Sequence, residues 1–537
     1  MQQLFIFFLL SKINQPCICF VVKAKLRQGY ENQRFLNFKQ RYIQAKGVAC
    51  LGLVILISFA YDKNHSEDFR FILVLRENHV INIMTTISLI QKYNVPGPRY
   101  TSYPTVPFWK VEQFTEKAWI ESLQKSFAES NHQGISLYIH LPYCESLCTF
   151  CGCNKRITKN HSVEEPYIDA LLKEWDMYTA LLSETPRIAE IHFGGGTPSF
   201  FKPNNLARLV KGILAKATLA DEIEFGFEGH PGNTTAEHLE VLHQLGFTRV
   251  SYGVQDYDLR VQTAIHRFQP FEQVKQVTEL SRKLGYTSIS HDLVFGLPFQ
   301  TLASIEDTIQ KTIALKPDRI AFYSYAHVPW IKGNGQRGFK DEDLPSPALK
   351  RQLYEKGRAM LEANGYFEIG MDHFALASDS MYVARQNGTL NRNFMGYTTT
   401  QTKVMIGLGV SSISDSWTAF AQNVKEIETY MDSINQNKLP LHRGHILNQE
   451  DLKIREQILN LICRFKTSWD TDTWTFEEKE ALFERLQPFV EDDLIVLHDN
   501  GVEVLEAGKT FIRNICMAFD MRMIRENPQH RLFSQTI

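Results

Sequence analysis

Residues 138–155 read Tyr-Ile-His-Leu-Pro-Tyr-Cys-Glu-Ser-Leu-Cys-Thr-Phe-Cys-Gly-Cys-Asn-Lys and contain the closely spaced series Cys144-x3-Cys148-x2-Cys151-x-Cys153. Thiolates this close in sequence can hold one soft or borderline metal centre. The first three cysteines, at C-x3-C-x2-C spacing, would leave one iron of a [4Fe–4S] cube without a protein ligand. Because an open iron can bind a substrate or cofactor, the spacing indicates a catalytic iron–sulfur cluster.

A closed zinc site made of all four thiolates is the alternative interpretation. Structural zinc sites usually join two separated cysteine pairs, so that the metal ties distant segments together. Here all four cysteines share one short loop, and Cys153 stands too close to Cys151 to join the same coordination sphere easily. The run favours iron–sulfur, while a zinc-stabilised interaction module and reactive or disulfide-bonded thiols stay open as lesser alternatives.

Short β-branched or aromatic runs alternate with longer helical patterns from Gly134 onward. This alternation predicts parallel βαβ units, whose right-handed crossovers curl the strands toward a barrel. Six strands are fewer than the eight of a closed barrel, so we expect an open, partial (β/α)6 barrel. The predicted strands are Ile135–His140, Ala189–Phe193, Glu222–Glu228, Arg249–Val254, Ser288–Val294 and Arg319–Tyr325. The predicted helices are Val163–Leu182, Asn205–Ala217, Thr235–Leu245, Phe271–Leu284 and Leu302–Leu315.

The regions on either side of these units divide the chain further. Residues 131–440 hold the predicted barrel with less regular trailing elements, and residues 441–537 turn mainly helical. An amphipathic run follows Asn448 as far as Arg464, and a short strand pair is expected around Leu494–Leu505. We therefore predict an α/β barrel followed by a mainly helical C-terminal domain, with residues 84–130 as an N-terminal segment on the substrate side.

Residues 1–83 differ from the rest because they show no sustained helical or strand period. Leu4–Leu10 is apolar but lacks the basic flank and cleavage site of a signal peptide. Gly47–Ala60 is too short for a membrane span, which needs roughly 20 apolar residues. Met84 opens a well-patterned stretch, so we expect residues 1–83 to be a non-native upstream extension; a short membrane-surface anchor around Gly47–Ala60 is the alternative.

Composition excludes several classes of function. The 537 residues are 44% hydrophobic and 22% charged, with a formal net charge of −2, so neither nucleic acid nor an acidic membrane attracts the chain in bulk. Nine clumped cysteines do not resemble a secreted disulfide framework. We therefore expect a cytoplasmic protein, where a reducing environment keeps the thiols free for metal.

Polar residues or glycines stand at or near the carboxyl ends of nearly all the predicted strands, where the active sites of such barrels lie. Three successive glycines after the second strand would let a ligand approach the backbone closely, although a tight turn explains them equally well. A lone carboxylate is more often structural, but an array at matching positions indicates a site. These residues are Tyr138 and His140, Gly194–Gly196, Glu228, Gln255, Asp292 and Tyr325–Ala326.

The cysteine spacing together with Gly194-Gly195-Gly196-Thr197-Pro198 resembles the radical S-adenosylmethionine (SAM) superfamily. Further runs narrow the resemblance to the family of oxygen-independent coproporphyrinogen III oxidases, from about Leu89 to the C-terminus. These runs are Pro98–Pro104, Cys151–Lys155, Gly253–Asp256, Gly296–Pro298, Tyr325–His327 and Asn393–Thr399.

The resemblance implies a [4Fe–4S] cluster held by Cys144, Cys148 and Cys151, with Cys153 functional but not a ligand. It also implies two SAM molecules. The first would contact Tyr138, Phe150, Gly195, Gly196, Thr197, Glu228 and Ile413. The second would contact Gln255, Arg267, Asp292 and Ala326.

The implied reaction is anaerobic oxidative decarboxylation of two propionates of coproporphyrinogen III to vinyl groups, giving protoporphyrinogen IX in haem biosynthesis. A 5′-deoxyadenosyl radical from SAM would remove a hydrogen from each propionate. The cofactors carry the chemistry, and the protein binds and orients them. Arg99, Arg267 and Arg392 are candidates to pair with substrate carboxylates. We expect a monomer that accepts electrons from an unidentified donor.

One run departs from the family pattern, and one relative competes with the assignment. Glu228-Gly229-His230-Pro231 has histidine where Glu-x-Asp-Pro is expected, which puts the detail of that loop in doubt. The competing relative is a haem chaperone of the same superfamily, which would bind haem instead of oxidising porphyrinogen. Cys153 and the run Arg99–Pro104 favour the oxidase.

Overall fold

The computed structural model describes residues 8–11, 17–25, 54–59, 68–76, 89–329, 336, 338–470, 474–528 and 532–536. The chain forms two compact units, Met1–Asn94 and Val95–Ile537. Among the described residues, no helix is both long and apolar enough to cross a membrane.

The first unit contains a four-stranded antiparallel sheet where the sequence suggested no regular period. Its strands are β1 (Phe8–Ser11), β2 (Cys17–Lys25), β3 (Val54–Phe59) and β4 (Asp68–Arg76), in the order β1-β2-β4-β3. β2 and β4 contain nearly continuous apolar runs, and such runs have no alternation to reveal a strand. β3 lies within Gly47–Ala60, whose other residues fall outside the described ones. That residues 1–83 are a non-native extension stays a prediction.

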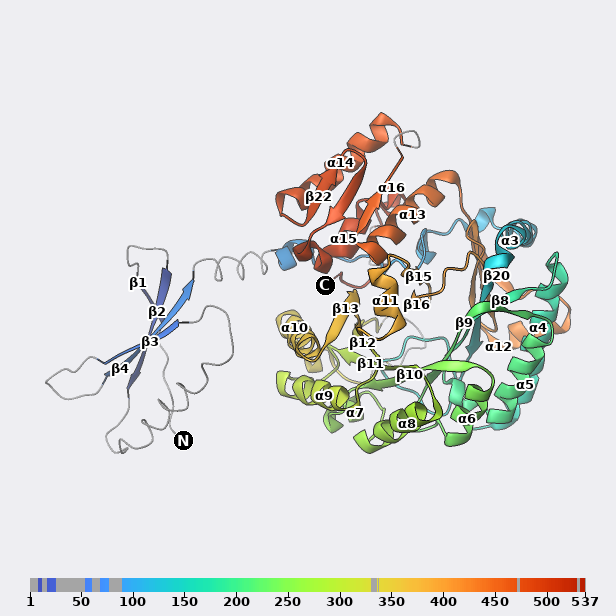
Figure 1. The fold of residues 1–537 in the computed structure, drawn as a ribbon, viewed down its shortest axis with the longest axis horizontal. Coiled ribbons are helices and arrows are strands. Elements are labelled where there is room, and N and C mark those ends of the chain that lie inside the picture. The colour runs from blue at the N-terminus through green and yellow to red at the C-terminus, as the bar shows by residue number, and fades with distance from the viewer. Residues whose placement is uncertain are drawn as a thin grey trace. The chain divides into compact units, whose positions relative to one another are not determined.

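The second unit is built on the predicted partial barrel (Figure 1). All six predicted strands are present, parallel and adjacent in space. Their bounds are β5 (Ile135–Leu141), β8 (Arg187–Gly195), β9 (Thr218–Gly229), β10 (Phe247–Gln255), β11 (Ser288–Phe295) and β12 (Arg319–Ser324). The predicted helices are α4 (Glu164–Leu181), α5 (Pro203–Leu214), α6 (Ala236–Gln244), α8 (Phe271–Leu284) and α9 (Leu302–Leu315).

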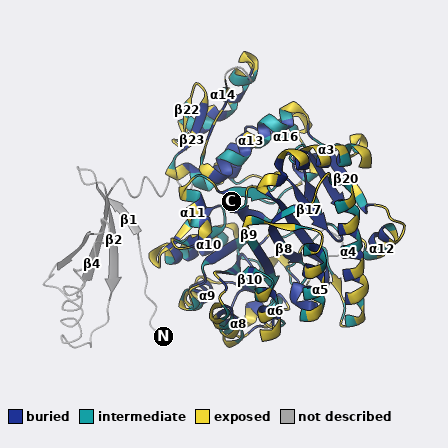
Figure 2. Cartoon of the chain, turned by 45° about the vertical axis from the view of Figure 1, so that its right-hand side comes forward, coloured by how far each residue is buried: buried dark blue, intermediate teal, exposed yellow. Residues whose placement is uncertain are grey.

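Local sequence explains where these helices begin and end. Thr301 caps α9 by accepting a hydrogen bond from the Ser304 amide. Gly285 ends α8 with a φ of 100°, a left-handed conformation that glycine adopts without strain. The helices then pack their apolar faces on the sheet and leave polar faces to solvent, so buried strands lie inside and exposed residues outside (Figure 2).

The sheet extends beyond the six predicted strands at both edges. β17 (Met405–Leu408) runs parallel to β5, and β18 (Ile413–Asp415), β19 (Ala419–Asn423) and β20 (Leu441–Ile446) continue antiparallel. At the other edge, β14 (His373–Leu376) and β13 (Tyr366–Gly370) follow β12 antiparallel. The barrel sheet therefore continues through Ile446, past the expected boundary at residue 440.

The C-terminal region combines helices with a small sheet. Its helices are α13 (Gln449–Arg464), α14 (Phe476–Glu491), α15 (Ile512–Met517) and α16 (Met521–Glu526). The sheet has the order β21 (Lys466–Ser468), β23 (Gly501–Val504), β22 (Ile495–His498).

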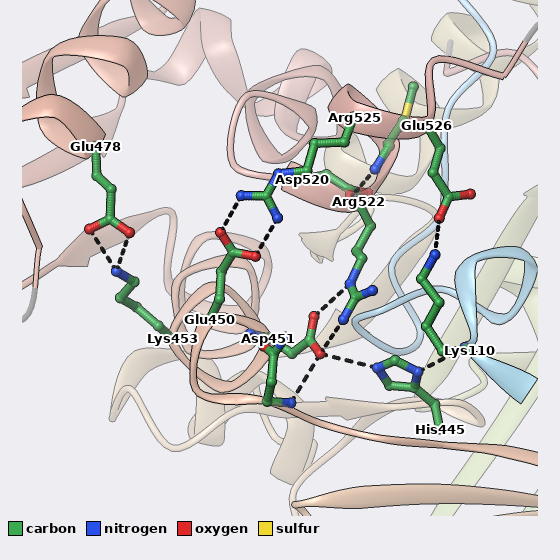
Figure 3. Close-up of polar contacts among 12 residues, drawn as sticks. Lys110, His445, Glu450, Asp451, Lys453, Glu478, Asp520, Arg522, Arg525 and Glu526 are labelled. Atoms are coloured by element: carbon green, nitrogen blue, oxygen red, sulfur yellow. Dashed lines mark hydrogen bonds and ion pairs between the residues drawn. The ribbon is translucent and has the colours of Figure 1, made fainter. Parts of the chain in front are cut away.

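Ion pairs hold α13 and α16 together (Figure 3). The buried Asp451 of α13 accepts hydrogen bonds from Arg522 of α16 at 2.9 and 2.7 Å and lies 3.1 Å from Nε2 of His445 on β20. Glu450 pairs with both terminal nitrogens of Arg525 at 2.6 Å. These contacts fix the helix α13 against the barrel sheet.

Candidate functional site

The cysteine loop follows directly from the first barrel strand. Cys144 ends β6 (Tyr143–Cys144), which pairs with β7 (Arg156–Ile157) and so closes the loop at its base. Nε2 of His140 donates to the Asn154 carbonyl at 2.9 Å, and Nδ1 lies 3.1 Å from the Tyr138 hydroxyl, which then donates to it. Burial lowers the pKa of His140, so this ring is a neutral hydrogen-bonding link between strand and loop.

A second anchor holds the middle of the loop. The Thr149 hydroxyl donates to the Ala264 carbonyl at 2.9 Å, and its amide donates to Ile265 at 3.0 Å, at the end of α7 (Leu259–Ala264). The adjacent Phe150 packs on an apolar cluster that includes Val261. The segment between β10 and β11 that contains α7 thus positions Phe150, a predicted SAM contact.

The thiols of the loop have distinct environments. Thr197 donates to Sγ of Cys144 at 3.3 Å, and Nη1 of Arg267 donates to Sγ of Cys148 at 3.6 Å. A hydrogen bond from Cys153, aided by Lys155, lowers the pKa of Cys151 to about 6, whereas burial raises that of Cys144 to about 11.

The donor set fits an iron–sulfur cluster in its chemistry. Soft sulfur donors lie beside the cations of Arg267 and Lys155, which favour the thiolate form that a metal requires. Within the described ranges, no three His, Cys, Asp or Glu side chains are already arranged to hold a metal ion. The assignment of Cys144, Cys148 and Cys151 as ligands therefore stays a prediction.

The glycine run packs directly beside the cysteine loop. A Cβ on Gly196 would lie 2.6 Å from the Pro142 carbonyl oxygen and 3.0 Å from Sγ of Cys144. A Cβ on Gly194 would lie 3.0 Å from Oε1 of Glu228 and 3.1 Å from the Tyr138 hydroxyl. Gly194 and Gly196 are thus required by the close approach of the protein's own atoms, and we call the glycine run, together with Tyr138 and Glu228, the cradle.

Tyr138, Glu228 and the glycine run therefore come together at the carboxyl ends of β5, β8 and β9. The side chain of Glu228 is 46% exposed and lies 3.4 Å from Nε2 of His192. An accessible carboxylate can accept hydrogen bonds from a ligand's ammonium or hydroxyl groups. These are the residues predicted for the first SAM.

Ile413 is the predicted contact that lies farthest from this group. It stands on β18, and β17 separates that strand from β5. Its carbonyl oxygen would lie 2.6 Å from a Cβ on Gly407, the register partner of Tyr138. The described contacts of its side chain are with an apolar cluster that includes Trp109 and Phe420, so Ile413 adjoins the cradle only through the intervening strand.

The residues predicted for the second SAM gather at β10 and β11. Nη2 of Arg267 donates to the Gly253 carbonyl at 2.6 Å, and Nε2 of Gln255 would lie 2.6 Å from a Cβ on Gly253. Asp292 accepts a hydrogen bond from Ser251 at 2.8 Å. Burial raises the pKa of Asp292 to about 7, and Glu228 adds to this effect, which shows that the two groups of predicted residues share one electrostatic environment.

Two further residues, Gln336 and Phe394, contact residues of these groups, and sequence patterns gave no sign of Gln336. Nε2 of Gln336 donates at 3.1 Å to the carbonyls of both Phe150 and Ala326, one predicted contact of each SAM. The ring of Phe394 packs edge-on against Tyr138 at 4.8 Å between centroids. Phe394 belongs to a run that was singled out, but a glutamine in a long connection carries no periodic signal.

The departure at His230 also has a structural role. Its Nδ1 accepts a hydrogen bond from the Gly232 amide at 3.0 Å, as an aspartate side chain would do in an Asx turn. Burial, followed by the charge of Arg267, lowers the pKa of His230 to about 3 and keeps this acceptor free of a proton. The loop after Glu228 is thus closed by the imidazole.

The comparisons agree with this arrangement. Residues 138–312 match the family model of the radical SAM superfamily, and together the open barrel and its rim place the chain in that class. The chain is 38% identical over 458 residues to an oxygen-independent coproporphyrinogen III oxidase from Pseudomonas aeruginosa, covering 84% of this chain and 98% of the relative. The corresponding oxidase from Escherichia coli is 37% identical over 456 residues, with the same coverage.

A solved structure gives the same result. Coproporphyrinogen III oxidase from Escherichia coli, described as a radical SAM enzyme, matches with a TM-score of 0.76 and 35% identity, covering 81% of this chain and 98% of that one. This chain therefore belongs to the oxygen-independent coproporphyrinogen III oxidase family. These relatives do not favour the haem-chaperone or zinc-module alternatives.

Proposed function

We propose that this protein converts coproporphyrinogen III to protoporphyrinogen IX by oxidative decarboxylation of two propionates. The supporting observation is that its relatives, matched over 98% of their length, are coproporphyrinogen III oxidases. The adjoining cysteine loop, glycine run and Glu228 agree with that chemistry. When bound, an iron–sulfur cluster and SAM supply a carbon-centred radical that removes hydrogen from an unactivated carbon. Each propionate, after losing that hydrogen atom, would lose carbon dioxide and pass one electron to an external one-electron acceptor, which leaves a vinyl group.

The chain's own residues bind, orient and shield the reactants. Cys144, Cys148 and Cys151 would hold the cluster, and Arg267 and Lys155 offset the negative charge of the thiolates. The glycine backbone and Glu228 would orient the first SAM. Exclusion of water matters because a free radical reacts with whatever it meets first.

The experiment that tests the function is an anaerobic assay of the cluster-loaded protein with coproporphyrinogen III, SAM and a reductant. The expected result is protoporphyrinogen IX, with two carbon dioxide molecules released for each product. A colourless, zinc-loaded protein without SAM cleavage would favour the interaction module, and haem binding without turnover would favour the chaperone.

We also propose that a second SAM binds at Gln255, Arg267, Asp292 and Ala326. The supporting geometry is that Ser251, the register partner of Glu228, donates to Asp292 at 2.8 Å. Arg267 donates at 2.6 Å to the carbonyl of Gly253, the register partner of Asp292. Equilibrium dialysis of the holoenzyme should count two SAM molecules per chain. Asp292→Asn should lower the count to one and leave the first site filled; an unchanged affinity for both would reject this assignment.

The remaining expectations concern oligomeric state, cellular location and electron donor. We propose a monomer that works in the reducing cytoplasm and receives electrons from a donor that is still unidentified. Sedimentation of the holoenzyme at micromolar concentration tests the first point.

A further inference from the structure

A pocket with both polar and apolar walls lies against β17 and β18, outside the residues predicted for cluster and SAM. Its walls come from residues 100–103, from β15 (Asn391–Asn393) and from α13. The walls carry hydroxyl and amide groups, apolar side chains, the carboxylate of Asp415 and three cations, Arg392, Lys403 and Arg455. Such a lining suits a small anionic group.

Only one of the three cations is neutralised by the protein. Arg455 forms a two-pronged pair with Asp415, at 3.1 and 2.5 Å. Arg392 lies over the Tyr397 ring at 4.6 Å, and its buried Nε and Nη1 have no hydrogen-bond partner. Neither Arg392 nor the exposed Lys403 pairs with a carboxylate among the described residues. Buried, unpaired charge is costly, so a ligand that brings an anion would be favoured here.

The three arginines suggested by sequence for substrate carboxylates are thus distinguished by the structure. Arg99 is taken by an ion pair with Asp372. Arg267 donates to the Gly253 carbonyl and to Cys148. Arg392 is the member of the set whose guanidinium lacks a protein acceptor at two of its nitrogens.

The pocket borders the SAM cradle. Asn393 of its wall is followed by Phe394, whose ring packs on Tyr138. Met405, also in the wall, pairs with Ser136 near the start of β5, two residues before Tyr138. A tetrapyrrole with one edge at the cradle could therefore reach the pocket with a peripheral side chain.

We propose that Arg392 and Lys403 bind a propionate carboxylate of the porphyrinogen, and that this propionate is one of those kept in the product. The identity of the ligand rests on the proposed function. An ion pair stabilises a carboxylate in the ground state, so the same pair at a reacting propionate would oppose its loss as carbon dioxide. The pocket therefore serves binding and orientation, and the reacting propionates lie elsewhere.

The test compares porphyrin binding by cluster-loaded variants. Fluorescence titration should show that Arg392→Gln weakens binding of coproporphyrin III, a stable oxidised analogue, by about 10- to 100-fold, as expected for loss of a charge-assisted hydrogen bond. Lys403→Gln, at an exposed position, should weaken it about 3- to 10-fold. Arg464→Gln removes the same charge from an exposed site outside the pocket and should change nothing. SAM cleavage without porphyrinogen should be the same in Arg464→Gln as in the unaltered protein.

Protoporphyrin IX separates retained from reacting carboxylates. If Arg392 binds a retained propionate, Arg392→Gln weakens protoporphyrin and coproporphyrin binding by the same factor. If Arg392→Gln weakens the binding of coproporphyrin alone, the assignment to a retained propionate is wrong. If Arg392→Gln and Arg464→Gln bind coproporphyrin with equal affinity, or if the unaltered protein does not bind it, the pocket is not a porphyrin site. Porphyrin binding that depends on Arg392, but without turnover, would instead reject the proposed oxidase activity and leave the pocket standing.

Discussion

The barrel rim and the pocket differ in how their charged side chains are paired. On the rim, the cation Arg267 donates to Sγ of Cys148, and its charge opposes the effects of burial and of Glu228 that raise the pKa of Asp292. In the pocket, Arg392 and Lys403 have no such partner among the described residues. The difference indicates that the rim is organised in advance for its cofactors, whereas the pocket depends on a ligand for its negative charge.

The largest loss of activity should come from substitutions in the cysteine loop. Cys148→Ser should abolish cluster loading, and with it all product formation, because serine is a much poorer ligand for iron. Cys153→Ser should load a cluster yet lose activity. Iron and sulfide content with visible absorption, measured anaerobically, checks both variants. A full cluster in Cys148→Ser would contradict the ligand assignment.

The glycine run offers the next largest effect. Gly196→Ala should lower product formation by about 100-fold, because its methyl group would collide with the Pro142 carbonyl and displace the cradle. Gly152→Ala, in the adjacent loop, adds a methyl group with nothing within 4 Å and is the matched control. Initial rates of the two cluster-loaded variants test this contrast. Equal rates would mean that close packing at Gly196 does not position the site.

These two regions also differ in how far sequence could predict them. The rim residues follow barrel strands, and the strands were recognisable because each alternates with an amphipathic helix such as α8 or α9. Because these strands are parallel, their carboxyl ends lie on the same side of the sheet. β17 escaped prediction because a four-residue strand with a glycine inside it has no measurable period.

The pocket could not have been predicted in the same way. Its walls join Tyr100, Arg392 and Arg455, which are far apart in the chain and lie on unrelated elements. The sequence identified Arg392 as a candidate to bind carboxylates. What distinguishes it from Arg99, which pairs with Asp372, is that two of its guanidinium nitrogens have no hydrogen-bond acceptor in the protein. That property depends on which residues fold next to it.

Helix α13, which forms one wall of the pocket, can be destabilised without substituting the cations of the pocket. Asp451→Ala should lower the free energy of unfolding by about 3 kcal/mol, because it leaves Arg522 and His445 without their buried acceptor. Lys117→Ala removes one partner of an exposed pair and should have an effect near zero. Denaturant titration measures both. Because α13 carries Arg455, Asp451→Ala should also weaken coproporphyrin binding and leave SAM binding unchanged; loss of both together would show that the rim and the pocket are not separable.

The smallest expected effect is the pH dependence of stability at the rim. Burial raises the pKa of Asp292 to about 7, so the folded cofactor-free protein holds this proton between about pH 4 and pH 7, while the unfolded chain releases it. The stabilisation is complete below about pH 4 and disappears as the pH rises to 7. Glu224 on β9, which β10 separates from β11, should behave in the opposite way. Burial favours its protonation, but Arg249 and Arg319 outweigh this and lower its pKa to about 2, so its contribution is lost only as the pH falls from about 4 to 2.

Asp292→Asn isolates the rim component from the rest of this profile. The variant keeps the acceptor for Ser251 but has no proton to lose, so its unfolding free energy should fall less than that of the unaltered protein between pH 4 and pH 7. Glu224→Gln should leave that interval unchanged and alter the profile below pH 4. Parallel curves for Asp292→Asn and the unaltered protein would show that Asp292 is ionised at neutral pH in the absence of cofactor. The rim would then carry an uncompensated charge, as the pocket does, and the contrast between the two regions would be one of sign alone.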